Sequence, residues 1–116
     1  MIKIFLPILL IVLSCGQSNP RYEYLEKNDS FRKKIGKENF VKSTHGFTYY
    51  ESQNLDHEEV LVFIHGFSVP SYIWDETYFE AIYKGLGAVR LDLYGRGFSS
   101  NPNIIYNDEL YADQVI

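Results

Sequence analysis

The stretch Val60-Leu-Val-Phe-Ile-His-Gly-Phe-Ser68 decides how this chain folds. Its first five residues are apolar, and four of those five are β-branched or aromatic, which favours a β-strand. A continuous apolar run, without polar residues at alternate positions, is typical of a strand buried on both faces in a helix-covered parallel sheet. The run stops at His65-Gly66, so we expect the strand to end there and a loop to begin.

A helix and a second strand are predicted after this loop. Ser71–Lys84 places apolar residues, Trp74 among them, near helical spacing and carries acidic side chains early, where the helix dipole favours them. Gly85 and Gly87 end the pattern, and Ala88–Asp92 indicates another strand. Strand, helix and strand within about 33 residues form a βαβ unit, in which the two strands run parallel with a right-handed crossover.

The other segments predict a hairpin, two helices and a loop. Residues 40–51 indicate two short strands around a turn at His45-Gly46, and this hairpin makes the sheet mixed. Residues 22–35 show a weak helical pattern, residues 52–59 indicate a polar loop, and residues 108–116 begin another helix.

Two loops of unusual composition follow the two strands of the βαβ unit. They comprise His65–Ser71 and Leu93–Pro102, the second being rich in turn-forming residues. Ligand sites in such sheets lie beyond the carboxyl ends of the strands. Both loops leave carboxyl ends, so we expect them to share one rim.

Composition limits the class of protein. The 116 residues suit one small domain or part of a larger one, and a hydrophobic fraction of 46% is enough for a core. The net charge is −4 without a long run of either sign, which gives no reason to expect a nucleic-acid partner. A basic cluster at Arg32-Lys33-Lys34 is interpreted as a solvated face or linker, with a weak contact to anionic lipid headgroups as the alternative.

The amino terminus has the order of a secretory signal. One lysine precedes about ten apolar residues, a run too short for a typical transmembrane helix. The segment Val12–Cys15 resembles a bacterial lipobox, which implies cleavage after residue 14, acylation of Cys15 and a membrane-anchored lipoprotein of the bacterial cell envelope. The alternative is an ordinary signal peptide with a chance cysteine. We therefore expect a signal peptide over residues 1–14, a tether with a possible short helix over 15–38, and a folded part over 39–116.

Two motifs now give a family resemblance. His65-Gly-Phe-Ser68 after an apolar strand, then Trp74, then Leu91-Asp-Leu-Tyr-Gly-Arg-Gly-Phe-Ser99, resembles the amino-terminal part of an α/β-hydrolase domain. The family pattern is H-G-x followed about two dozen residues later by D-x-x-G-x-G-x-S, and every fixed position is present. The resemblance covers about residues 39–116. It implies an α/β fold with a mixed, mostly parallel sheet and an antiparallel opening hairpin, here as an incomplete domain.

The resemblance also implies roles for single residues. Acyl transfer builds negative charge on a carbonyl oxygen, and backbone N–H groups aimed at it lower the barrier. By resemblance, the Phe67 N–H is one such donor, Gly66 lets the backbone approach the substrate, and His65 shapes the loop with its ring. By the same resemblance, four residues form a structural loop beside the site without taking part in catalysis: Asp92, Gly95, Gly97 and Ser99.

Plainer interpretations stay open for both motifs. His65-Gly66 could be only a strand terminator, and the second motif could be only a surface loop. The pair Gly95 and Gly97 might suggest a dinucleotide-binding loop, but position 100 is Ser where that loop needs a third glycine.

The catalytic residues of the family have no counterpart in this sequence. The nucleophile should lie in G-x-S-x-G, and the nearest match, Gly97–Asn101, ends in Asn and follows the wrong strand. The family order is nucleophile, acid, then His, yet all three histidines come before that point. We interpret His45 as a turn residue and His57 as a solvated loop residue.

The expected function follows from the motifs that are present and from the catalytic residues that have no counterpart. The leading hypothesis is an amino-terminal fragment of a membrane-anchored α/β-hydrolase, inactive alone. The intact protein would hydrolyse an ester, amide or related bond of a small-molecule substrate, without metal or cofactor. The alternative is a non-catalytic surface lipoprotein or binding module on a partial α/β fold. A nucleotide-binding domain is a third class, for which no phosphate-binding glycine loop is seen.

Overall fold

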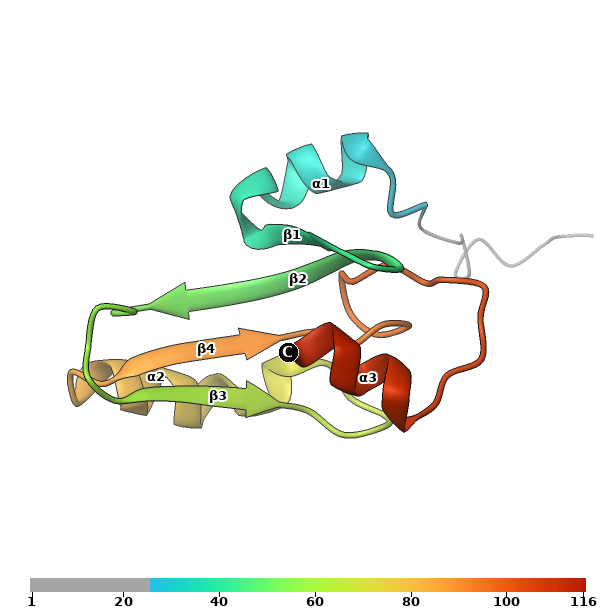
Figure 1. Ribbon diagram of the computed structural model, residues 1–116. Coiled ribbons are helices and arrows are strands. Elements are labelled where there is room, and N and C mark those ends of the chain that lie inside the picture. The colour runs from blue at the N-terminus through green and yellow to red at the C-terminus, as the bar shows by residue number, and fades with distance from the viewer. Residues whose placement is uncertain (1–25) are drawn as a thin grey trace, which may run out of the picture.

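The computed structural model describes residues 26–116, which form a small α/β domain (Figure 1). The predicted signal peptide, the predicted lipid-attachment residue Cys15, the predicted tether and the first four residues of the expected 22–35 helix lie outside these described residues. Within residues 26–116, no helix is long and apolar enough to cross a membrane.

One helix precedes three successive strands in the described chain, and a helix, a strand and a last helix follow them. A short 3-10 turn, Lys37–Asn39, follows the first helix, and another, Ser71–Trp74, precedes the second. In chain order the elements are α1 (Asp29–Ile35), β1 (Phe40–Ser43), β2 (Gly46–Gln53), β3 (Val60–Ile64), α2 (Asp75–Tyr83), β4 (Gly87–Leu91) and α3 (Asp108–Val115).

The strands form one mixed sheet in the order β1-β2-β4-β3. The prediction of parallel strands in the βαβ unit is confirmed, because β3 pairs with β4 in parallel from Val60↔Gly87 to Ile64↔Leu91. The expectation of a mostly parallel sheet is wrong for the described strands: β2 pairs antiparallel with both β1 and β4. The hairpin enters the sheet through β2, so it contributes two of the three pairings.

Strand β3 lies at an edge of the sheet, and the prediction that it is buried on both faces is wrong. Side chains alternate between the faces of a strand, and Phe63, on the α2 face, is the only buried residue of β3. Val62 on the opposite face is 54% exposed. No described element pairs with the outer edge of β3 or covers this end of the opposite face, so the apolar run is half solvated.

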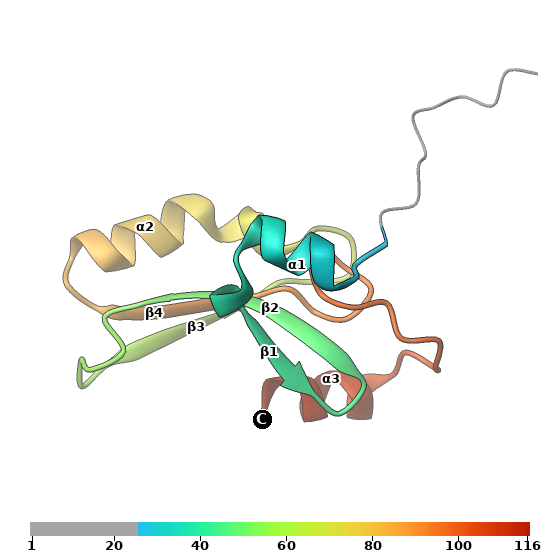
Figure 2. The ribbon, with the colours of Figure 1, turned by 90° about the horizontal axis from the view of Figure 1, so that it is seen from above.

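The helices cover both faces of the sheet. Figure 2 shows α1 and α2 on one face and α3 on the other. The core on the α2 face joins one residue of β3, one of β4 and one side of α2. Its buried members are Phe63, Tyr78, Ala81 and Ala88, with Trp74, Ile82 and Leu86 packed against them.

Helix boundaries differ slightly from the predicted ones. Within the described part of the predicted 22–35 helix, α1 starts only at Asp29, because the Asn28 side chain accepts the Phe31 N–H at 3.0 Å and caps it there. The helix expected from Ser71 begins as the 3-10 turn and becomes α-helical at Asp75. It ends at Tyr83, two residues before the first of the predicted terminating glycines.

Helix α1 packs against the sheet and the loop after β4. The Arg32 guanidinium lies 3.9 Å from the centre of the Phe47 ring, so the basic cluster is only partly solvated. The Phe31 and Phe98 rings meet edge to face at 5.8 Å. The Asn39 side-chain amide donates to the Tyr50 carbonyl at 3.1 Å. These contacts fix α1 over β2 rather than leaving it on a tether.

Candidate functional site

The loops that follow β3 and β4 meet at one rim, as predicted, and the His65 ring joins them. His65 is 4% exposed. Its Nε2 accepts the Leu93 backbone N–H at 2.9 Å, and its Nδ1 lies 2.6 Å from the Gly66 carbonyl oxygen. Because a backbone N–H can only donate, Nε2 must be unprotonated, so the proton of the neutral ring is on Nδ1 and is donated to Gly66.

This bond orients the peptide between Gly66 and Phe67. In a trans peptide the C=O and N–H point in opposite directions. With the Gly66 carbonyl drawn toward His65, the Phe67 N–H points away from the ring. The Phe67 residue is 86% exposed, and its N–H has no hydrogen-bond partner within residues 26–116. The geometry leaves one oriented donor at the rim.

Arg96 ties the two loops a second time. Its Nε donates to the Phe67 carbonyl, and its guanidinium lies 4.7 Å from the centre of the Phe67 ring. Its Nη1 also donates to the Gly95 carbonyl at 3.0 Å. The peptides before and after Phe67 are therefore held by His65 and by Arg96, respectively. The sequence motif contains Arg96, but its spacing alone gave no partner for it.

Asp92 is the buried centre of the loop after β4. Its side chain is 2% exposed, and its two carboxylate oxygens accept the backbone N–H groups of Ser71 and Phe98, each at 2.8 Å. The bond to Ser71 reaches the start of the segment that leads into α2. At Gly97 (φ +47°) an added Cβ would lie 1.9 Å from the Asp92 carboxylate. Only glycine combines this backbone conformation with this approach.

Two serines fasten the same loop to β2. Ser99 is fully buried; its hydroxyl accepts the Tyr49 N–H at 2.8 Å and donates to the Asp92 carbonyl. Ser100 accepts the Phe47 N–H on its hydroxyl at 2.9 Å, while its own N–H donates to the Phe47 carbonyl at 2.9 Å. Beyond the end of β4, the loop thus continues the pairing along β2.

Gly95 lies under the Tyr106 ring, and a Cβ added to Gly95 would lie 3.0 Å from a carbon of that ring.

Gln114 is a structural residue that the sequence did not suggest. Its amide oxygen accepts the Tyr94 N–H at 2.8 Å, and its amide nitrogen donates to Thr48 and to the Asp92 carbonyl at 3.0 and 3.1 Å. Tyr94 is buried, and its hydroxyl lies 2.5 Å from the Ser43 hydroxyl. A glutamine on a short helix carries no motif, so its neighbours become known only from the fold.

A charged network under α2 was also missed. The Arg90 guanidinium bonds to Glu51 and to Asp75 and lies 4.5 Å from the centre of the Tyr78 ring. The Tyr49 hydroxyl donates to Glu51 at 2.7 Å. Burial, followed by the hydrogen bond to Glu51, raises the pKa of Tyr49. The register that places Arg90 opposite Glu51 depends on the β2–β4 pairing, which the chain order does not reveal.

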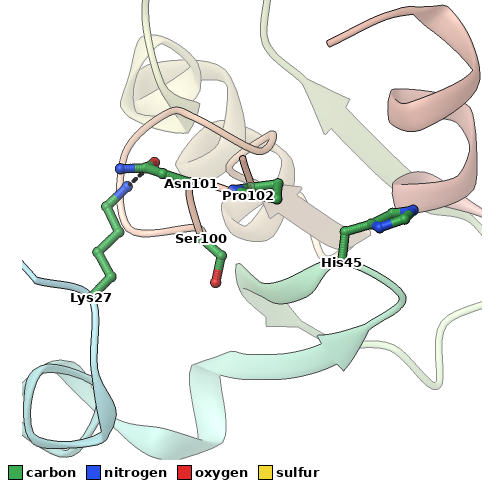
Figure 3. A pocket seen from close by; sticks show the side chains of 5 residues that line it. All are labelled: Lys27, His45, Ser100, Asn101 and Pro102. Carbon is green, nitrogen blue, oxygen red and sulfur yellow. Dashed lines mark hydrogen bonds between the residues drawn. The ribbon is translucent and has the colours of Figure 1, made fainter. Parts of the chain in front are cut away.

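A polar pocket of about 290 Å³ lies beside the second loop, and Figure 3 shows the side chains that line it. Its lining comprises Lys27, His45, Ser100, Asn101 and Pro102. The Lys27 amino group donates to the Asn101 side chain at 2.9 Å, whereas the His45 ring points away from Lys27. As predicted, His45 is in a turn, and the exposed His57 accepts the Glu59 N–H at 3.0 Å. The rim and this pocket therefore do not bring a second histidine to His65.

Within residues 26–116, no three His, Cys, Asp or Glu side chains gather as metal ligands. Comparison with known proteins found no matching family profile, no matching curated protein and no matching solved structure.

Proposed function

We propose that residues 39–116 are the oxyanion-hole part of an α/β-hydrolase that is anchored to the membrane of the cell envelope through lipid on Cys15. The substrate is a small molecule with an ester, amide or related bond, and the nucleophile, acid and catalytic histidine come from chain beyond the 116 residues. The proposal rests on the two sequence motifs. The single observation that supports it most is the oriented N–H of the exposed residue Phe67, whose two flanking peptides are anchored.

The chemistry of acyl transfer explains why such an arrangement would be useful. A donor lowers the barrier only if it is already aimed at the oxygen on which charge develops, since no reorganisation is then needed. The His65 ring fixes the peptide that carries the donor, and Arg96 fixes the next one. The exposed apolar β3 is consistent with further chain packing beside this strand.

The first experiment tests whether catalysis needs more chain. The coding DNA downstream is read in all three frames for a G-x-S-x-G segment. The 116 residues are then joined in one reading frame to the segment that carries this motif, and this joined product is purified alongside the 116-residue chain. Hydrolysis of p-nitrophenyl butyrate is measured for both. We expect activity from the joined product, loss of that activity when its motif serine is replaced by Ala, and only the blank rate from the 116-residue chain. Hydrolysis above the blank by the short chain, or no such motif in any frame, contradicts the proposal; the latter favours a non-catalytic surface lipoprotein.

A second experiment isolates the proposed donor in the joined product. Phe67→Pro removes the backbone N–H, while Phe67→Ala keeps it and removes the exposed ring, so the pair is matched. We expect Phe67→Pro to lower kcat by about 10²–10³, the loss typical of one oxyanion donor, and Phe67→Ala to keep most of the rate. Equal losses in the two variants, with unchanged circular dichroism, would exclude this N–H as the donor.

A further inference from the structure

A second cavity, of about 310 Å³, lies between α1, the sheet and the segment before α2. Its volume is at the lower end of small-molecule sites. Its apolar walls come from separate parts of the chain: Phe31, Tyr49, Pro70, Tyr72 and Phe98. Parts of the same two loops line it, but Gly66 and Phe67 do not, so the cavity does not include the residues that carry the proposed oxyanion donor. Figure 2 shows that α1 and α2 lie on the same face of the sheet, which is the face that bears the cavity.

Each oxygen of the two carboxylates in the lining already accepts a hydrogen bond. Glu51 accepts the Tyr49 hydroxyl on one oxygen, at 2.7 Å, and the Arg90 guanidinium on the other. Asp92 accepts two backbone N–H groups, one on each oxygen. A ligand that brings a cation or a donor would therefore find no carboxylate oxygen without a partner.

The two cationic side chains in the lining, in contrast, each have an N–H donor that the described residues do not use. The Lys27 amino group donates to the Ser99 carbonyl at 2.6 Å and to Asn101 at 2.9 Å, and an ammonium has a third N–H. Arg90 uses Nε for Glu51 and Nη1 for Asp75, while its Nη2 has no partner among residues 26–116. Burial lowers the pKa of Lys27, partly opposed by the charge of Asp92, so an added anion would stabilise the charged amine.

We propose that this cavity binds a small organic carboxylate with an aromatic or branched apolar body. The carboxylate accepts the third Lys27 N–H, and the body packs against Phe31, Tyr49 and Phe98. Two of these rings already meet edge to face, Tyr49 and Phe98 at 5.0 Å, which gives a flat aromatic ligand a preformed wall. The unmatched donors select the anion, and the rings select the apolar body.

The test is a two-dimensional amide NMR titration of the full 116-residue chain with 3-phenylpropionate. The matched probe is 3-phenylpropan-1-ol, which has the same body without the charge. We expect the carboxylate to bind about tenfold or more tightly than the alcohol, since hydrogen bonds between charged groups exceed neutral ones by this order. The amides of Ser71 and Phe98, which border the cavity through Asp92, are expected to shift most.

Lys27→Met keeps the apolar stem and removes the charge. We expect it to weaken binding of 3-phenylpropionate about tenfold or more while leaving the alcohol unchanged. Lys34→Met, on the exposed side of α1, is the control and is expected to bind both probes like the natural chain. Amide dispersion shows in the same spectra whether each variant is folded. Equal affinity for both probes, equal losses in the two lysine variants, or no shift at 10 mM probe (about the weakest affinity worth measuring) overturns the proposal.

Discussion

Replacing Gly97 by Ala should destabilise the chain through one collision with Asp92. The added Cβ would lie 1.9 Å from one carboxylate oxygen and 2.3 Å from the carboxylate carbon, so the carboxylate must move. Moving it breaks at least one of its bonds to the Ser71 and Phe98 N–H groups, each at 2.8 Å. A hydrogen bond to a charged group contributes about 1.5–3 kcal/mol. The φ of +47° adds about 1–2 kcal/mol of strain for any residue with a Cβ.

The expected loss of unfolding free energy is therefore about 2.5–5 kcal/mol, a large part of the roughly 5–15 kcal/mol typical of a domain. The matched control is Gly85→Ala, because Gly85 also has a positive φ, +81°, but nothing lies within 4 Å of its Cβ position. That variant should lose only the strain of about 1–2 kcal/mol. Urea unfolding followed by circular dichroism measures both losses, with sucrose added if a variant is too unstable in water.

A double-mutant cycle assigns the difference to the collision. In an Asp92→Ala background the carboxylate is gone, so Gly97→Ala should cost only the strain. The double variant should therefore lose about 1.5–3 kcal/mol less unfolding free energy than the sum of the losses in the two single variants. The reasoning is refuted if Gly97→Ala costs no more than Gly85→Ala. It is also refuted if the cost of Gly97→Ala is the same with and without Asp92.

Two further predictions concern the packing of β2. Burial and the bond to Glu51 raise the folded-state pKa of Tyr49, so its contribution is fully present below the unfolded pKa of about 10 and is lost as pH rises above it. Unfolding free energy should therefore fall more steeply above pH ~10 in the natural chain than in Tyr49→Phe. The control is Tyr83→Phe, at a residue 87% exposed, which should keep the slope of the natural chain. Identical slopes for all three chains would contradict this prediction. Ser99→Ala should cost about 1–3 kcal/mol in urea unfolding, because it leaves the buried Tyr49 N–H without its acceptor. Ser68→Ala, at an exposed serine, should change stability by less than about 0.5 kcal/mol, and a similar value for Ser99→Ala would show that its hydroxyl contributes little.

The sequence predicted the type and order of most elements because local patterns determine them. The β3–α2–β4 unit, the opening hairpin and α3 all have the expected type, and their ends shift by a few residues. The burial of β3 was misjudged because an apolar run reports composition, whereas burial depends on which neighbours lie beside the strand. The expectation of a mostly parallel sheet failed for a similar reason, since β2 enters between β1 and β4.

The same distinction between local patterns and fold-dependent neighbours applies to the candidate site. The motifs pointed to His65, Asp92 and the loop glycines, which belong to short local patterns. They did not point to Gln114 or to the Arg96–Phe67 contact. These contacts join residues that are distant in sequence and carry no local pattern, so only the fold brings them together.

Gln114 has a consequence for the order of events during synthesis. Its side chain closes a bond to Thr48, a partner 66 residues earlier in the chain. The hairpin of β1 and β2 consists of local contacts and can form as soon as residue 53 has left the ribosome. Thr48 and the Asp92 carbonyl must then wait for the last turn of α3 before their final partner arrives. A released chain that ends at residue 113 should therefore leave the loop after β4 more open to protease, and one residue more supplies the last of the side chains that fasten that loop.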